Sequence, residues 1–248
     1  MFSLPIIQGL IDRRMLVNFR CDPAVIATLL PPPFRPKLVR GFAIAGICLI
    51  RLRHIRPRKF PRAIGLSSEN AAHRIAVEWT DDAGQTREGV YVPRRDSSSM
   101  LNHLVGGRIF PGVHHHATFD VEERDGDLSV AFRSDDGSAS VRVKARVAEA
   151  LPRDSIFQSL EEASEFFRGG SVGFSPRDGG KVLDGLELRT VQWHVTPLHV
   201  LDVHSSFFAN PHVFPPGSAV FDNALLMRAI EHEWHAFDSS PGTPGEVG

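Results

Sequence analysis

The chain has 248 residues, its 28 basic side chains nearly balance 29 acidic ones, and its isoelectric point is about 6.9. This balance leaves no strong field for nucleic acid or an anionic membrane, so neither is expected as a partner. Two cysteines are too few for a disulfide framework, and we expect reduced thiols in a cytoplasmic protein. The apolar run near the start has no basic region ahead of it, and no run approaches the roughly 20 residues of a membrane span. We therefore expect neither a signal peptide nor a membrane span.

The first half of the chain predicts strands interrupted by short helices. Residues 13–21 predict a strand, and Asp22-Pro23 supplies the N-cap and first position of a helix that ends before Pro31. Residues 38–53 predict a buried strand, and residues 54–65 are more typical of a solvated basic loop than of an anion site. Strands over 67–80 and 87–95 form a predicted hairpin around a turn at 81–84. Residues 97–106 predict a short helix that ends at glycine.

The second half predicts hairpins, one helix, further strands and a last helix. Asp-Gly turns at 125–126 and 136–137 indicate two hairpins after a strand that begins at three histidines. A capping box at 159–162 opens a helix that glycine ends. NALLMRAIEH, residues 223–232, predicts the last helix, and residues 239–248 have the composition of a disordered tail. We expect one domain over residues 1–238, and a barrel or two packed sheets rather than a layered α/β fold.

Histidine is unusually frequent, with 12 in the chain, and His114, His115 and His116 are consecutive. On a strand, His114 and His116 share one face while His115 points to the other. Neutral imidazole is a common metal ligand, but a stable site usually needs three or four ligands and one strand face offers two. We therefore expect no bound metal and no cofactor. For His194 and His199, hydrogen-bonded core roles are favoured over functional ones.

Arg20 lies in an otherwise apolar strand, where an inward-facing cation needs a partner. Two interpretations fit this pattern equally well. Arg20 pairs structurally with Glu69 or Glu88, or it binds an anionic ligand. Glu88 by itself has the pattern of an ordinary exposed strand residue.

Three segments, FRCDPAVIATLLPPPF, REGVYVP and GGRIFPGVHHHA, follow one another in order along the chain. They resemble the opening Y-R-T-D-P-E-x-L-x-x-L-L-P-x-P-L, the E-G-x-Y strand and the G-R-E-x-x-G-x-P-K-K segment of the acetoacetate decarboxylase-like superfamily. Within it, the likeness is greatest to an uncharacterised YqjF-like branch. SLEEASEFF resembles the helix of that branch, and VQWHVTPLHVLDVHSSFF resembles its final strand. The resemblance covers residues 13–210. It implies an α+β, β-dominated fold, an antiparallel β-barrel or double sheet with a few peripheral helices around a cavity.

The resemblance also implies roles for individual residues. Arg20 falls on an arginine associated with the family's active site, Glu88 on an active-site glutamate, and Glu69 near another. The family uses two adjacent lysines, one of which forms a Schiff base with a ketone. Here His115 and His116 occupy those two positions. Imidazole cannot form that iminium, so the resemblance implies the fold and the cavity without the Schiff-base mechanism.

We expect a central cavity lined by Arg20, Glu69, Glu88, Arg108, His114 and His116. In this interpretation the catalytic residues are His114, His115, His116 and Glu88, and the substrate-binding residues are Arg20, Glu69 and Arg108. The first hypothesis is a lysine-independent enzyme for a small carbonyl or carboxylate compound, with histidine as general acid and base. The alternatives are a non-catalytic small-molecule binding protein and a metal-dependent enzyme that uses the histidine cluster. The sequence leaves the substrate and a homo-oligomer open.

Overall fold

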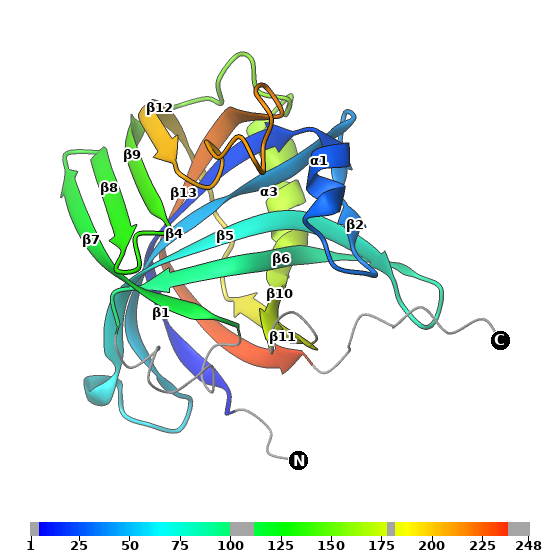
Figure 1. Cartoon of the computed structure of the whole chain (residues 1–248). Helices are drawn as coiled ribbons and strands as arrows, with labels where there is room; N and C mark the ends of the chain where they lie inside the picture. The colour runs from blue at the N-terminus through cyan, green and yellow to red at the C-terminus, as the bar shows by residue number, and fades with distance from the viewer. Residues whose placement is uncertain (1–4, 100–111, 178–181, 238–248) are drawn as a thin grey trace.

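A computed structural model describes residues 5–99, 112–177 and 182–237 (Figure 1). Its helices are α1 (Pro23–Thr28) and α3 (Leu160–Arg168), with the short 3-10 helices η1 (Arg62–Ile64) and η2 (Gly169–Ser171). Its strands are β1 (Ile7–Cys21), β2 (Arg35–Pro36), β3 (Leu38–Val39), β4 (Phe42–Pro57), β5 (Leu66–Thr80), β6 (Thr86–Ser97), β7 (His114–Arg124), β8 (Asp127–Ser134), β9 (Ser140–Val147), β10 (Val172–Arg177), β11 (Val182–Thr190), β12 (Thr196–Ser205) and β13 (Ala219–Phe237).

The strands pair into two closed rings that share a wall. The wall consists of β13, β1, β4, β5 and β6, each antiparallel to the next. In the first ring, which we call the α3 ring, β10 lies parallel to β6, and β11 joins β10 to β13. In the second, the hairpin ring, β7, β8, β9 and β12 connect β6 to β13. This arrangement confirms the predicted β-dominated fold with few helices.

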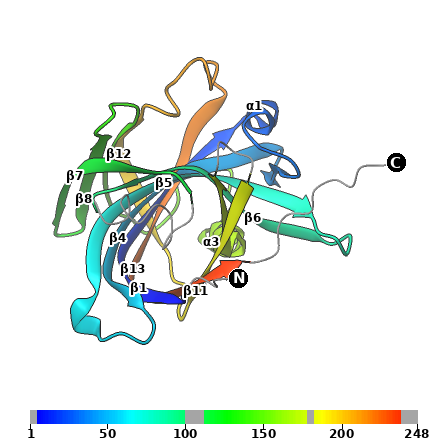
Figure 2. The same cartoon turned by 60° about the horizontal axis from the view of Figure 1, so that its bottom comes forward.

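Helix α3 lies among the strands of the α3 ring, as Figure 2 shows in a nearly end-on view. The backbone N–H of Glu162 donates to Ser159 Oγ at 3.1 Å, which confirms the predicted N-cap. Ala163 and Phe167 face the wall and are buried there. Their burial fixes the helix against the strands, since a helix of this length gains most of its stability from packing.

The alternation along β1 gives the wall a core on each face. Met15, Val17 and Phe19 belong to the larger core, together with the strands of the hairpin ring. Leu16 belongs to the second core, which also contains Phe167 of α3. Because successive strand residues point to opposite faces, Asn18 shares the face of Leu16. Polar side chains of β1 are thereby carried into the α3 ring.

The predicted last helix is wrong, because residues 223–232 belong to β13. The segment contains good helix formers, but β13 pairs with β1 along most of its length and is buried on both faces from Asp222 to Met227. A strand buried on both faces shows no alternation, and tertiary pairing overrides helix propensity. The predicted loop over 54–65 is shorter, since β4 continues to Pro57. Most of the helix predicted over 97–106 and the tail 239–248 lie outside the described residues.

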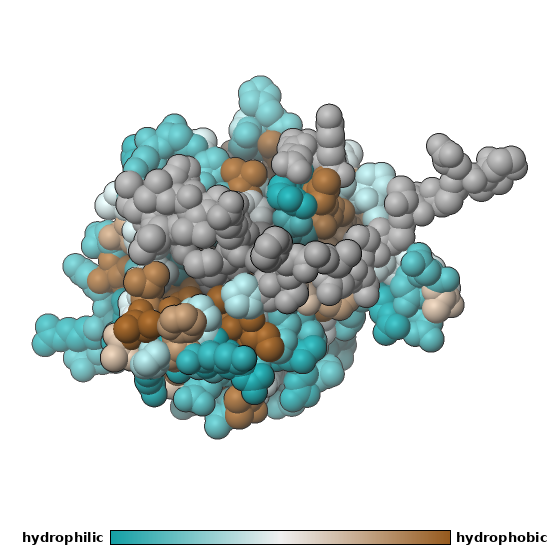
Figure 3. Space-filling model, turned by 90° about the horizontal axis from the view of Figure 1, so that it is seen from below, coloured by the Kyte–Doolittle hydropathy of each residue, from teal (hydrophilic) through white to brown (hydrophobic). Residues whose placement is uncertain are grey.

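The connection between β4 and β5 carries apolar side chains on the surface. Phe60 and Ile64, and Leu66 at the start of β5, are all about half exposed. Figure 3 shows brown apolar groups among hydrophilic ones on the face seen from below. Among the described residues, no helix has both the length and the apolar character required to cross a membrane.

Candidate functional site

His115 and His116 bind a surface turn. His115 Nδ1 lies 2.9 Å from a carboxylate oxygen of Asp136, and His116 Nδ1 lies 2.7 Å from one of Asp135. Both aspartates are in the turn between β8 and β9 and are exposed. The contacts fasten the start of β7 to the neighbouring hairpin. The catalytic role predicted for these two histidines stays a prediction.

His114 occupies a different environment at the first position of β7. It lies beside Arg95 in the parallel register of β6 and β7. The two side chains line a small cavity of about 50 Å³, together with Asp96 and Trp234. Of the three consecutive histidines, His114 therefore has the position closest to the one predicted for a cavity residue.

Glu69 belongs to an ion network rather than to this cavity. Its carboxylate lies 2.5 Å from Arg13 and 2.5 Å from Arg51. Arg13 is completely buried and also contacts Glu123 at 2.6 Å. These charges neutralise one another, which is the structural role that the sequence left open for Glu69.

Arg20 does not pair with Glu69 or Glu88, as the sequence suggested. Its guanidinium lies 3.2 Å from the buried carboxylate of Asp222 and donates to the backbone carbonyl of Asp154 at 2.7 Å. Its partner is thus a residue of β13, directly before the segment for which the sequence predicted a helix. Arg108, the remaining predicted substrate ligand, lies outside the described residues.

Glu88 pairs with Lys37 at one end of α3. Lys37 Nζ also lies 4.4 Å from the centre of the Phe166 ring, a cation–π contact. The carboxylate fills the space where a side chain on Gly169 would stand. Glu88 is nevertheless exposed, as expected of an ordinary strand residue, and its contact is a lysine.

A chain of buried polar contacts crosses the wall from Asp222 to Cys48. Asn223 Nδ2 donates to Asp222 at 2.6 Å, and Asn18 Nδ2 donates to Asn223 Oδ1 at 2.8 Å. Arg74 donates one guanidinium N–H to Asn18 Oδ1 and its Nε–H to Cys48 Sγ at 3.1 Å. Asp222 also contacts Arg20. These hydrogen bonds therefore connect Arg20, a predicted substrate-binding residue, to the interior of the α3 ring.

Gly46 makes this crossing possible. In the sheet it stands between Asn18 on β1 and Arg74 on β5. A Cβ at this position would lie 2.3 Å from the carbonyl oxygen of Val17. The missing side chain leaves the path between the two polar groups open, which explains a glycine inside a buried strand.

Three arginines converge on the ring interior with no carboxylate partner among the described residues. Arg14 lies 3.8 Å from Cys48 Sγ, and its Nε atom is buried without a hydrogen bond in this part of the chain. Arg74 is bound by Asn18 and Cys48, and Arg95 Nε donates to Ser175 Oγ at 3.2 Å. Burial lowers the pKa of Arg95 to about 10, so the group still carries its charge at neutral pH. Buried cations of this kind favour an anion beside them.

Two adjoining pockets lead to Arg14 and Arg74. The arginine pocket, of about 20 Å³, is lined by Arg14, Leu16, Lys37, Arg74, Ala76, Gly89, Val90, Phe166, Phe167 and Gly170. An outer pocket of about 300 Å³ shares Arg14 and Gly170 with it and also touches Thr190 and Trp193. A small molecule in the outer pocket would therefore meet the guanidinium of Arg14 first.

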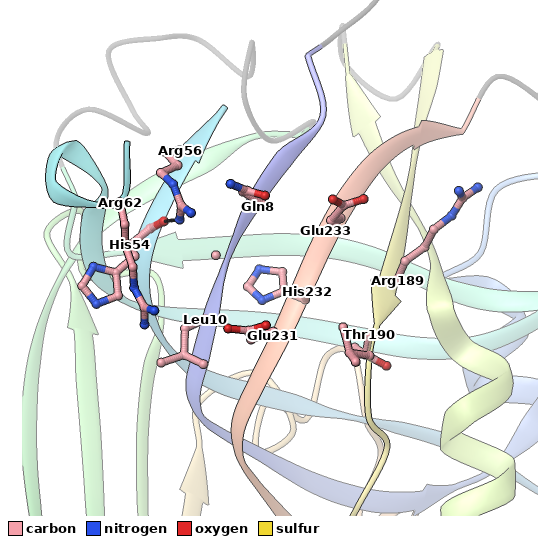
Figure 4. A pocket seen from close by; sticks show the side chains of 12 residues that line it. Gln8, Leu10, His54, Arg56, Arg62, Arg189, Thr190, Glu231, His232 and Glu233 are labelled. Atoms are coloured by element: carbon pink, nitrogen blue, oxygen red, sulfur yellow. Dashed lines mark hydrogen bonds between the residues drawn. The ribbon is translucent and has the colours of Figure 1, made fainter. Parts of the chain in front are cut away.

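A groove of about 290 Å³ meets the outer pocket at Thr190 and Val191 (Figure 4). In the figure His54, Arg56 and Arg62 lie on one side of it and Arg189 on the other, with glutamates of β13 between. Two of these charged groups have ion-pair partners in the described residues. Glu233 lies 3.3 Å from Arg58 and 2.9 Å from His235, and Arg189 lies 2.7 Å from Glu187. The groove is thus a mixed-charge approach to the outer pocket.

Sequence reasoning missed five residues of this interior: Arg14, Lys37, Cys48, Arg74 and Arg95. The sequence did contain a signal for Arg74. It is a cation in the apolar strand AHRIAVEW and, like Arg20, needs a partner if it faces inward. The described residues contain no group of three or more side chains that could hold a metal ion.

Several solved structures share this fold at low sequence identity. An acetoacetate decarboxylase-like enzyme from Sphingomonas wittichii RW1 is 13% identical, with a TM-score of 0.56 over 98% of this chain and 94% of the other. Acetoacetate decarboxylase from Legionella pneumophila is 14% identical, with a TM-score of 0.53 over 97% and 90%. The enduracididine biosynthesis enzyme MppR, complexed with pyruvate, is 10% identical, with a TM-score of 0.55 over 97% and 92%. The fold is therefore that of the acetoacetate decarboxylase-like proteins.

The sequence matches a family model over residues 11–222, most of its length. The chain belongs to the family of uncharacterized conserved proteins designated DUF2071. No curated protein matches it. The predicted resemblance to an uncharacterised branch of this superfamily is confirmed.

Proposed function

We propose that the protein binds a small carboxylate compound inside the α3 ring, with Arg14 and Arg74 as its counter-charges. The observation that carries this proposal is that both arginines line one pocket, while no described carboxylate neutralises either of them. Arginine binds a carboxylate through two parallel hydrogen bonds, which gives direction as well as energy. The pyruvate complex of MppR supports a ligand of this class in the same fold.

A lysine-independent enzyme is the second candidate, favoured by the cavity that His114 shares with Arg95. Histidine transfers protons near neutral pH, and a cation beside it stabilises an enolate as it forms. In this proposal His114 is the catalytic residue. Glu88 and Arg20 act as positioning residues, through Lys37 and through the buried chain to Arg74.

Binding is tested with acetate, pyruvate and acetoacetate, against acetamide and acetone as neutral analogues of similar size. A ligand that binds only the folded protein stabilises it by mass action, so the carboxylates raise the melting temperature and the neutral compounds do not. Arg74→Gln abolishes the shift. The matched control is Arg35→Gln, because Arg35 is half exposed and pairs with Glu78 on the surface. Equal effects of charged and neutral compounds would refute the proposal.

Catalysis is tested by the exchange of the methyl protons of pyruvate in D2O, followed by NMR. An enzyme that removes a proton next to the carbonyl accelerates this exchange, and His114→Gln removes the acceleration while pyruvate still binds. If the wild-type protein binds pyruvate without accelerating exchange, the non-catalytic binding function remains and the role of His114 as base is excluded for this ligand.

A further inference from the structure

The two cysteines lie on opposite faces of the wall. Cys21 is buried in the apolar core of the hairpin ring. Cys48 lies on the face of the α3 ring and is 3% exposed. Its sulfur is 3.1 Å from Arg74 Nε and 3.8 Å from a terminal nitrogen of Arg14. One chain thus contains two buried thiols, one in apolar surroundings and one between two guanidinium groups.

The charges around Cys48 favour its ionised form. Burial by itself raises the pKa of this thiol, but the charges and hydrogen bonds of Arg74 and Arg14 outweigh burial and lower it. For Cys21, burial dominates and raises the pKa to about 12. Among the described residues, no carboxylate contacts Arg14 or Arg74, and the sulfur is the contact that the two guanidinium groups share. A thiolate is both the counter-ion and the nucleophilic form of cysteine.

We infer that Cys48 is the anionic partner of Arg14 and Arg74 and a nucleophile for small carboxylates that carry an electrophilic carbon. This inference rests on the proposed function for the choice of ligand, because Arg14 and Arg74, which both contact the sulfur, line the arginine pocket, although Cys48 itself does not line it. The geometry that ionises the sulfur stands independently of it. In the reaction a sulfur lone pair attacks the carbon, a C–S bond forms, and the leaving group departs with its electron pair. The thiol proton is lost to solvent before the attack, because the two guanidinium groups favour the ionised sulfur.

Iodoacetate and iodoacetamide test this inference, because they differ in charge and little in size. With iodoacetate the carbon–iodine bond breaks and iodide leaves. We expect the native protein to gain one carboxymethyl group, mapped to Cys48, while Cys21 does not react. Cys21→Ser keeps the addition, Cys48→Ser loses it, and the unfolded wild-type chain gains two. The pH midpoint of the iodoacetamide reaction lies below the value of about 8.5 for an ordinary thiol.

The carboxylate preference is measured against N-acetylcysteine. The ratio of the iodoacetate rate to the iodoacetamide rate should exceed that of the free thiol by about tenfold, since a charge-assisted hydrogen bond holds the anionic reagent. Arg74→Gln raises the pH midpoint, whereas Arg74→Lys, which keeps the charge, raises it less. Circular dichroism confirms that each variant is folded, and the wild-type measurements need no variant.

The ionised state of Cys48 and its preference for carboxylates can be refuted separately. A native protein in which Cys48 reacts no faster than Cys21, or reacts with a midpoint at or above that of a free thiol, overturns the thiolate assignment even where pyruvate binds. A low midpoint with no preference for iodoacetate overturns the carboxylate specificity and the proposed function, and leaves the thiolate intact.

Discussion

His73 is a fully buried imidazole on the hairpin-ring side of β5. Neither of its ring nitrogens has a hydrogen bond among the described residues, and its ring lies 5.0 Å from that of Phe207. Burial, aided by the charge of Arg94, lowers its pKa to about 3 from an ordinary value of 6.5. Between these two values the unfolded chain binds a proton that the folded chain does not. Stability is therefore complete above pH 6.5 and falls as the pH falls.

Replacement of His73 by phenylalanine should reduce this pH dependence. The wild-type protein loses about 2 kcal/mol through His73 between pH 7 and pH 5, because each pH unit below 6.5 costs about 1.4 kcal/mol. His73→Phe keeps an aromatic ring beside Phe207 and cannot bind the proton. Urea denaturation at the two pH values measures the difference. His199→Gln is the control, because His199, like His194, is exposed and not in the core as the sequence suggested. An unchanged difference for His73→Phe would contradict the assignment.

Arg20 offers a second prediction at this scale. Asp222 also accepts hydrogen bonds from Ser155 Oγ at 2.7 Å, Ile156 N at 2.9 Å and Asn223 Nδ2 at 2.6 Å. Arg20→Met therefore costs about 1–3 kcal/mol, because the buried carboxylate keeps three donors. Asp222→Asn in the Arg20→Met background restores part of the loss, measured by chemical denaturation. A wild-type denaturation curve for Arg20→Met would show that the pair contributes nothing.

The sequence could predict that Arg20 needs a partner, but not which residue supplies it. Asp222 is 202 positions away in the chain. The same limit applies to Cys48 and Arg74, whose strands look apolar when each is read alone. The charge pattern of the site exists only across strands, whereas each local pattern describes a single strand.

At the scale of elements, helix signals with local chemistry could be predicted and long-range pairing could not. The N-caps Asp22 and Ser159 are sequence signals that satisfy backbone groups two or three residues away, and both are observed. The segment of β13 over 223–232 is composed of good helix formers, and its partner β1 lies at the other end of the chain. Its conformation follows from that pairing, which no window of the sequence contains.

Gly169, just after α3, gives a prediction for this element. A Cβ there would lie 1.8 Å from Glu88 Oε1, so Gly169→Ala must displace the carboxylate from Lys37. We expect a loss of at most about 1 kcal/mol, because the carboxylate ends an exposed side chain that can move aside and a surface ion pair contributes little. Gly173→Ala is the matched control, because its Cβ would meet Val90 at an ordinary 3.5 Å. Equal melting temperatures for the two variants would show that Glu88 moves freely.

For the whole molecule, we predict that no Schiff base forms. Lys37 lines the arginine pocket, but it is paired with Glu88 and lies over the Phe166 ring. Both contacts engage the side-chain nitrogen, which would have to leave them before it could attack a ketone. Incubation with acetoacetate or pyruvate, followed by borohydride, should add no mass. An addition that maps to Lys37 and disappears in Lys37→Arg would restore the mechanism of the lysine-dependent relatives.

The metal content of the whole protein can also be predicted. Two histidines on one strand face provide fewer ligands than a stable transition-metal site needs. Untagged protein should therefore contain far less than one zinc, iron or nickel per chain by elemental analysis. About one metal ion per chain would promote the metal-dependent hypothesis.

The overall class of the fold followed from hairpin signals and from the family resemblance, and both are local patterns in a fixed order. A barrel was among the predicted folds, but the strands that close the rings did not follow, because closure depends on the parallel contact of β6 with β10 and on the pairing of β11 with β13. The residues that line the cavities of the α3 ring come together when the ring closes. For this reason the local motifs did not indicate that its arginines lie close to one another.

Closure of the wall through β1 and β13 has a consequence during translation. Asn18 and its partner Asn223 are separated by 205 residues, so the ribosome releases β1 long before β13 has been made. In the interval one edge of β1 has no neighbour, and an unpaired edge can recruit another nascent chain. The vulnerability of this protein in the cell is thus greatest late in synthesis, and ends when the last strand emerges.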